Sequence, residues 1–206
     1  MISYRKLQFE ALINYVASNS IVLYNTIMHR FNLIIPEFDN FLLSRNLFLE
    51  ATIIGGAALQ LLGVVNRTTK DCDVLEPKLN NEVLKAANDF AETVGLKSTW
   101  LNNGPSSLSQ ELPEGWENRR HGLYKGKALH LKTLGREDTL RAKLYAYLDR
   151  GIDLDDLVAL RPSKAELGLI VPWLNERDGN THWKEHVSSS INELQKKVNE
   201  TIKRRI

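Results

Sequence analysis

The stretch Ile53-Ile54-Gly55-Gly56-Ala57-Ala58-Leu59, followed by Arg67-Thr68-Thr69-Lys70-Asp71-Cys72-Asp73-Val74, decides the fold that this sequence predicts. The run from Phe48 to Ile54 is apolar and β-branched, which predicts a buried strand that ends at Gly55-Gly56. A short helix over residues 57–62 is expected next. Residues 71–75 alternate polar and apolar and stop before Pro77, which predicts a second strand. The chain therefore passes from a buried strand, through a glycine turn and a helix, to a strand that carries two aspartates.

The segments on either side favour a mixed fold. Apolar positions at helical spacing between Tyr4 and Arg45, with a break at Pro36, predict two or three helices. A helix over residues 80–94 ends at Gly95, and residues 121–124 and 127–132 form a candidate hairpin around Lys125-Gly126. The segment from Trp100 to Arg120 is rich in Asn, Gly, Pro and Ser and is expected to be a long surface loop.

Only helical patterns follow Gly135, over residues 137–148, 154–160, 164–174 and 182–205. We therefore expect an α+β fold, in which a small mixed sheet is flanked by helices. Its parts are an N-terminal helical cap (1–47), a core (48–134) and a C-terminal helical region (135–206).

Composition excludes several classes of protein. With 206 residues, 43% hydrophobic and 25% charged, the chain is globular and not disordered. The net charge of +2 leaves nucleic-acid binding to local groups such as Arg119-Arg120 or the basic tail, which equally suits a solvated helix end. The lone Cys72 excludes an intramolecular disulfide. No run approaches the roughly 20 apolar residues of a membrane span, so a cytoplasmic protein without membrane contact is expected.

The two aspartates predict a metal site. Successive side chains of a strand alternate between its faces, so Asp71 and Asp73 share one side and Cys72 takes the other, as a small buried hydrophobe. Two neighbouring carboxylates repel unless a cation lies between them, and Mg²⁺, or Mn²⁺ in its place, binds carboxylate and phosphate oxygens together. The alternative for an Asp-x-Asp sequence alone is a solvated strand end.

Donors for phosphate surround this pair. Gly55 and Gly56 let the backbone approach a phosphate closely, and the following helix N-terminus favours negative charge. Arg67 and Thr69 lie on the approach to Asp71 and can hydrogen-bond a triphosphate. A Gly-Gly pair alone is more often a tight turn, but the combination indicates a nucleotide and metal site.

These residues resemble a known signature. GGAAL followed by RTTKDCDV is similar to the signature of the DNA polymerase β-like nucleotidyltransferase superfamily, and the stretch from Arg141 to Leu157 resembles the second signature of a bacterial branch that includes abortive-infection and toxin-antitoxin nucleotidyltransferases. The resemblance, over roughly residues 48–160, implies that Asp71 and Asp73 bind metal and act in catalysis. It also implies that Lys143 contacts the nucleotide and that Asp156 assists catalysis, with Asp153 as the other aligned carboxylate.

The function expected from this resemblance is transfer of an NMP from an NTP to an acceptor hydroxyl on RNA, tRNA or a protein. The setting would be a toxin-antitoxin or phage-defence system, with a cognate partner protein. Lys143 and Arg150, seven residues apart, share a helix face that can offer two cations to a triphosphate. The alternative for Lys143 is an extended side chain beside the core of an amphipathic helix.

One departure favours a second hypothesis, a weakened binding module that serves as antitoxin or regulatory subunit. Members of the superfamily carry a third carboxylate on a later strand, and the candidate strand 126–132 has none. His130 is either a base in its place or an inward polar residue on an edge strand, and Asp156 is the other candidate base. The stretch from His182 to His186 spells H-x-x-E-H, but it lacks a third zinc ligand, so an exposed helix start is expected there.

Overall fold

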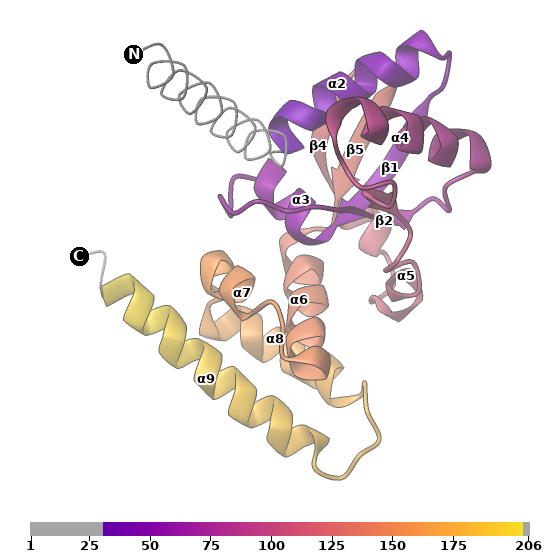
Figure 1. Ribbon diagram of the computed structural model, residues 1–206. Helices are drawn as coiled ribbons and strands as arrows, with labels where there is room; N and C mark the ends of the chain where they lie inside the picture. Colours follow the sequence, from indigo (N-terminus) through magenta and orange to yellow (C-terminus); the bar gives the residue numbers. More distant parts are fainter. Residues whose placement is uncertain (1–30, 204–206) are drawn as a thin grey trace, which may run out of the picture.

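A computed structural model describes residues 31–203, and the N-terminal helices expected before residue 31 lie outside the described residues. Strands are interspersed with helices up to residue 133 and only helices follow, so the expected mixed fold is confirmed (Figure 1). The elements are α2 (Phe31–Ser44), β1 (Leu49–Ile54), α3 (Gly55–Leu61), β2 (Cys72–Glu76), α4 (Asn81–Val94), β3 (Leu101–Asn102), α5 (Leu108–Glu111), the 3-10 helix η1 (Trp116–Arg119), β4 (His121–Lys125), β5 (Leu129–Thr133), α6 (Arg136–Arg150), α7 (Leu154–Leu160), α8 (Lys164–Asn175) and α9 (Trp183–Lys203).

The strands form one mixed sheet in the order β3-β2-β1-β5-β4. Central β1 pairs antiparallel with β2 and parallel with β5, and β4 and β5 form the expected hairpin. In the β1–β2 pair, Ile54 lies opposite Asp73. The last residue of β1 therefore lies beside the first residues of β2, at one end of these central strands. This pairing brings the Gly-Gly turn next to the aspartates.

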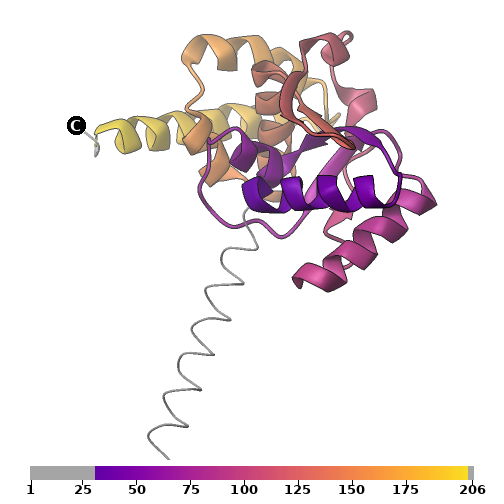
Figure 2. The ribbon, with the colours of Figure 1, turned by 90° about the horizontal axis from the view of Figure 1, so that it is seen from above.

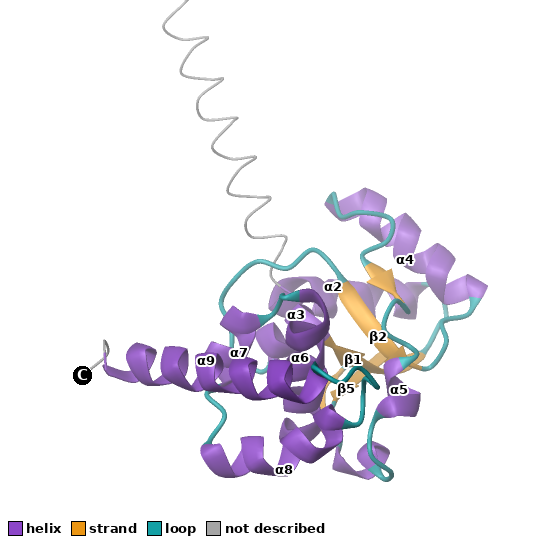
Figure 3. Cartoon of the chain, turned by 90° about the horizontal axis from the view of Figure 1, so that it is seen from below, coloured by secondary structure: helices purple, strands orange, loops and turns teal. Residues whose placement is uncertain are grey.

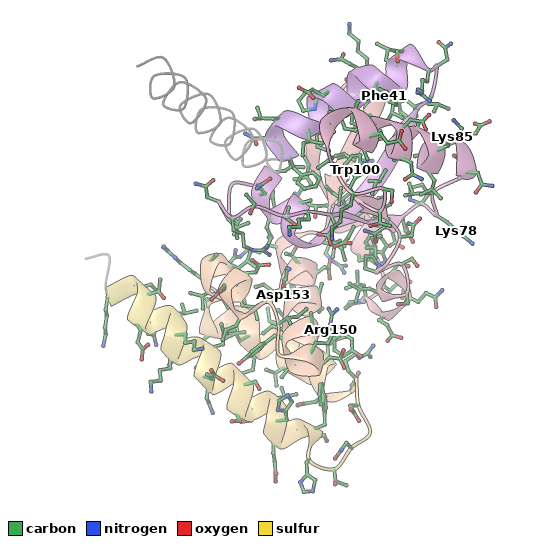
Figure 4. All side chains as sticks on the ribbon, viewed as in Figure 1. Phe41, Lys78, Lys85, Trp100, Arg150 and Asp153 are labelled. Atoms are coloured by element: carbon green, nitrogen blue, oxygen red, sulfur yellow. The ribbon has the colours of Figure 1, made fainter. Side chains whose placement is uncertain are left out.

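Helices α2 and α4 cover one face of this sheet side by side (Figure 1). Their aromatic residues pack around Trp100, with ring centroids of Phe31, Phe38 and Phe90 at 5.0–6.1 Å from the Trp100 ring. Trp100, labelled in Figure 4, also donates its indole N–H to the Ala87 carbonyl of α4 at 2.9 Å. The first hydrophobic cluster thus includes α2, which packs directly on the sheet.

Pro36 does not interrupt α2, so the expected break there is wrong. A proline inside a helix removes one backbone hydrogen bond but leaves the apolar stripe intact. Phe31, Ile34, Ile35 and Phe38 are all buried on that stripe. Tertiary packing of this face stabilises the helix across the proline.

The C-terminal helices form a second hydrophobic cluster (Figure 2). Helix α9 has 21 residues and buries Val187, Ile191, Leu194 and Val198 on one stripe, as its helical spacing predicts. Helix α3 joins the two clusters, because Ala57 and Ala58 belong to the first cluster and Leu59 to the second. Figure 3 shows α3 between the strands and the helices α6 and α7.

The segment from Trp100 to Arg120 is only partly the expected surface loop. It contains β3, α5 and η1, and Leu112 and Trp116 are buried against Leu75 and Leu134 in a third small cluster. The polar composition conceals these apolar anchors, which fold the segment onto the open face of the sheet. None of the helices within residues 31–203 has the length and apolar character needed to cross a membrane.

Candidate functional site

The Gly-Gly turn presses directly against the aspartate strand. Gly55 has a φ of +76°, and a Cβ built on it would lie 2.8 Å from Asp73 Oδ2. A Cβ on Gly56 would lie 2.9 Å from Thr69 Oγ1 and 3.3 Å from an Arg67 guanidinium nitrogen. The positive φ of Gly55 favours glycine there, and a side chain at either position would displace Asp73 or Thr69. The turn thus lies directly against Arg67, Thr69 and Asp73.

The aspartates point away from the core, as the strand alternation predicts. Cys72 is fully buried, while Asp71 is exposed just before β2 and Asp73 is half-buried. The Thr69 hydroxyl donates to Asp71 Oδ1 at 3.3 Å. Burial, together with the charges of Asp73 and Asp71, raises the pKa of the Cys72 thiol, so Cys72 is a packed hydrophobe and not a nucleophile.

Asp73 carries an unbalanced charge. Burial raises the pKa of its carboxyl, and Asp71 and Asp153 raise it further, whereas the hydrogen bond from Asn102 and the charge of Lys143 lower it. The raised pKa is the net result. A carboxylate in this state gains free energy when a cation binds beside it.

Asn102 is a site residue that the sequence did not reveal. It lies on β3 directly beside Asp73, and its amide nitrogen donates to Asp73 Oδ1 at 3.1 Å. Its amide oxygen accepts from the backbone N–H of Gly104 at 2.7 Å, which fixes the orientation of the amide. Strand β3 has two residues, too few for alternation to be recognised, so only its place beside β2 identifies Asn102.

His130 lies at the wrong end of the sheet to act as the base. It pairs with Glu50 near the start of β1, whereas Asp73 lies opposite Ile54 at the end of β1. Its ring contacts Phe48, and its Nε2 lies 3.2 Å from the Gly126 carbonyl oxygen. Strand β5 lies between β1 and β4, so the expected edge strand is wrong, and His130 is a half-buried polar residue with local contacts on an internal strand.

A charged side chain of α7 contacts Arg67, which lies next to the Gly-Gly turn. The carboxylate of Asp156 on α7 accepts from Arg67 Nε at 3.0 Å and Nη2 at 2.8 Å, and from Lys143 Nζ at 2.8 Å. Lys143 on α6 also forms an ion pair with Asp153 at 3.0 Å. Burial raises the pKa of Asp156, but the hydrogen bonds from Arg67 and Lys143 outweigh it, so the net shift is downward.

Asp153 has a φ of +73° at the start of α7, a conformation that is uncommon for residues other than glycine. Figure 4 labels Asp153 and Arg150 at the junction of α6 and α7. Arg150 is exposed and lies 3.9 Å from its neighbour Asp149. The buried Lys143 and the exposed Arg150 thus have different surroundings.

The donor set at the aspartates fits one hard cation. Within residues 31–203, no three His, Cys, Asp or Glu side chains come together as a metal site. Two carboxylates with an unbalanced charge suit Mg²⁺ or Mn²⁺, since Mg²⁺ takes one or two protein carboxylates and completes its shell with water and phosphate oxygens. Asp71 and Asp73 are the residues that would hold it.

Other sequence candidates have structural roles. Arg119 donates to the fully buried Asp138 at 2.8 Å. Arg120 donates to the Thr52 hydroxyl at 3.1 Å and the Glu117 carbonyl at 2.7 Å and forms no ion pair within residues 31–203. His182 is exposed and His186 Nε2 lies 3.0 Å from the Leu148 carbonyl oxygen. The exposed helix start expected for the H-x-x-E-H stretch is thereby confirmed.

Comparison with known proteins gives one match. Residues 29–162 match the family described as nucleotidyltransferase of unknown function (DUF6036), a range that contains every site residue named above from Gly55 to Asp156. No curated protein and no solved structure matches this chain. The chain therefore belongs to this family of nucleotidyltransferases of unknown function.

Proposed function

We propose that this protein is a metal-dependent nucleotidyltransferase that moves an NMP from an NTP to an acceptor hydroxyl on RNA, tRNA or a protein. The observation that carries the proposal is the contact of Asp73 with Gly55, with Asp71 on the same side of the chain and Arg67 beside Gly56. The two carboxylates that would bind a metal and the arginine that would bind phosphates thus lie beside the same glycine turn. The family match supports the same reaction class.

The residues divide the work. Asp71 and Asp73 would hold Mg²⁺ or Mn²⁺, which when bound supplies positive charge to the triphosphate. Arg67, Thr69 and Lys143 would hold the phosphates; α3 has only seven residues, so these side chains carry most of the contact. The acceptor oxygen forms a bond to the α-phosphorus, the bond to the β-phosphate oxygen breaks, and pyrophosphate leaves. Such transfers depend mainly on positioning and charge, so a strong base is not required.

The cellular setting is part of the proposal. The likeness of residues 141–157 to the toxin branch supports a role in a toxin-antitoxin or phage-defence system with a cognate partner protein. An NTP substrate and an RNA or protein acceptor fit a cytoplasmic location. Since Arg119 is paired with Asp138, an RNA acceptor would need Arg120 or other cations near the site.

The test is label transfer. Purified protein is incubated with Mg²⁺, each α-labelled NTP, and either total RNA or cell lysate. We expect label on one acceptor class with wild type and none with Asp71→Ala. Asp89→Ala is the matched control, because Asp89 is a surface aspartate of α4 paired with Arg45 and Lys85. Equal results for wild type and Asp71→Ala would contradict the proposal.

A second candidate is a binding module with the same fold. The observation that favours it is Asn102, which places an amide beside Asp73 on the neighbouring strand where a third carboxylate could stand. This protein would bind an NTP tightly without turnover and would co-purify with a partner protein. Pyrophosphate release that depends on Asp73 would eliminate this candidate.

A further inference from the structure

Asp156 is a buried carboxylate whose charge is fully engaged. The residue is 1% exposed, and its two oxygens accept three hydrogen bonds from two cations. Hydrogen bonds between ionised groups are stronger than neutral ones, and a two-pronged guanidinium contact also fixes orientation. Asp156 therefore determines where both cations lie.

The two cations come from different parts of the molecule. Arg67 belongs to the segment between α3 and β2, where its carbonyl accepts from the Gln60 side chain at 2.8 Å. Its guanidinium is beside the Gly-Gly turn, since a Cβ on Gly56 would lie 3.3 Å from Arg67 Nη2. Lys143 belongs to α6, and its charge is felt by Asp73. Asp156 thus joins the edge of the core to the helical region at the site.

These contacts make Asp156 poorly suited to accept a proton. Burial raises its pKa, but Arg67 and Lys143 lower it below the ordinary value of 3.8. Its oxygens are also covered, with the side chain 2% exposed. An acceptor hydroxyl would have to displace Arg67 or Lys143 to reach it.

We propose that Asp156 is a positioning residue, which holds Arg67 and Lys143 together beside the Gly-Gly turn so that both cations meet the triphosphate of a bound NTP. The inference rests on the proposed function and assigns Asp156 a role other than that of the base. Arg67 is half-exposed and can turn towards a ligand while remaining tethered, whereas Lys143 is buried and stays fixed.

The experiment measures NTP binding, which needs no knowledge of the acceptor. MgATP, MgGTP, MgCTP and MgUTP are titrated separately into wild type, Asp73→Asn, Asp156→Asn and Asp155→Asn by calorimetry at low temperature. Asp155 is the matched control because it is the adjacent, exposed aspartate of the same helix. Lys143 keeps Asp153 as a partner in Asp156→Asn, which favours folding of the variant.

We expect Asp156→Asn to weaken binding of the preferred NTP about tenfold, which corresponds to about 1.4 kcal/mol of binding free energy. Asp155→Asn should leave the affinity unchanged. Wild-type affinity in folded Asp156→Asn, with binding lost in Asp73→Asn, would overturn the positioning role and leave the proposed function standing. Absence of NTP binding by wild type would overturn the proposed function and the inference with it.

A charge-compensated variant covers the case in which Asp156→Asn does not fold. Asp156→Asn with Arg67→Gln removes one charge of each sign and is compared with Arg67→Gln alone. If Asp156 also positions Lys143, the double variant binds the NTP about threefold more weakly than Arg67→Gln, because coupled residues contribute non-additively. Equal affinities would show that Asp156 does not position Lys143.

Discussion

Asp73 and Asp156 are both shielded from solvent near the same glycine turn, yet their surroundings are opposite. Asp73 receives one hydrogen bond from a neutral amide and lies near two further aspartates, and its pKa is raised by burial and by those charges. Asp156 is more deeply buried, but Arg67 and Lys143 balance it and lower its pKa. Within residues 31–203, Asp73 feels the charge of Lys143 but forms no ion pair, whereas Asp156 contacts two cations directly.

This difference separates a carboxylate that binds a cation from one that stabilises the structure around the site. An unbalanced carboxylate costs stability and is retained where a cation arrives with the substrate, whereas a balanced one stabilises a fixed arrangement. The two residues should therefore respond oppositely to the same isosteric substitution, Asp to Asn. Each prediction below tests one side of this contrast.

The largest effect is expected at Asp73. Asp73→Asn should lower the rate of nucleotidyl transfer by roughly 100- to 1,000-fold, as for the loss of a group that stabilises transition-state charge. The measurement is initial rate of label transfer with Mg²⁺, with Asp89→Asn as the surface control. A rate within twofold of wild type would show that Asp73 does not serve the reaction.

The same variant should gain stability. Because the pKa of Asp73 is raised, the folded state holds its proton more tightly, and stability falls as pH rises from 3.8 through the raised value. Asp73→Asn removes this loss, so the free energy of unfolding at neutral pH without metal should rise by about 1 kcal/mol. Replacement of a functional residue often stabilises a protein in this way. Denaturant unfolding in a chelating buffer measures it, and a destabilised variant would contradict the contrast.

Asp156→Asn should destabilise the protein by about 3 kcal/mol, since it leaves the buried Lys143 with one carboxylate in place of two. The pKa of Asp156 is lowered, so its contribution is fully present above 3.8 and is lost as pH falls through the lowered value. The stability difference from wild type should therefore disappear in acid, the reverse of the Asp73 case. A difference that does not depend on pH would indicate packing and not charge.

Asp39 sharpens the contrast because it is buried and forms no ion pair with any residue that the structure describes. It accepts backbone N–H groups of Lys127, Ala128 and Leu129 at 2.7–3.0 Å and the Tyr124 hydroxyl, which pins α2 to the β4–β5 turn. Burial raises its pKa, but these donors lower it overall. Asp39→Asn should cost about 2 kcal/mol, since an amide cannot accept from all of them. Chemical unfolding at neutral pH and in acid measures the cost, which should shrink as pH falls below 3.8.

The sequence predicts one half of this contrast better than the other. Gly55-Gly56 and the Asp71-Cys72-Asp73 alternation are local patterns, and the strand pairing of Ile54 with Asp73 brings them together as expected. The helix over 81–94, with its Asn80 cap and Gly95 end, is local in the same way. The contact of Arg67 with Asp156 spans 89 residues and has no local signature. Asn102 depends on a strand of two residues, and the anchoring of Trp116 depends on Leu75 of β2 and on Leu134, which directly follows β5.

The smallest effect is expected at His130, one of the two candidate bases that the sequence offered. Its ring packs edge-on against Phe48 at the start of β5, and it pairs with Glu50 at the end of the sheet away from Gly55. His130→Gln keeps a polar group and should leave the rate of transfer unchanged, and loss of the ring contact with Phe48 should cost about 0.5 kcal/mol of stability. The initial rate of label transfer with Mg²⁺ is the decisive measurement, and denaturant unfolding checks the stability. If His130→Gln loses most of its transfer rate while its stability is unchanged, then His130 acts in the reaction. The assignment of the site to the Gly-Gly turn would then be wrong.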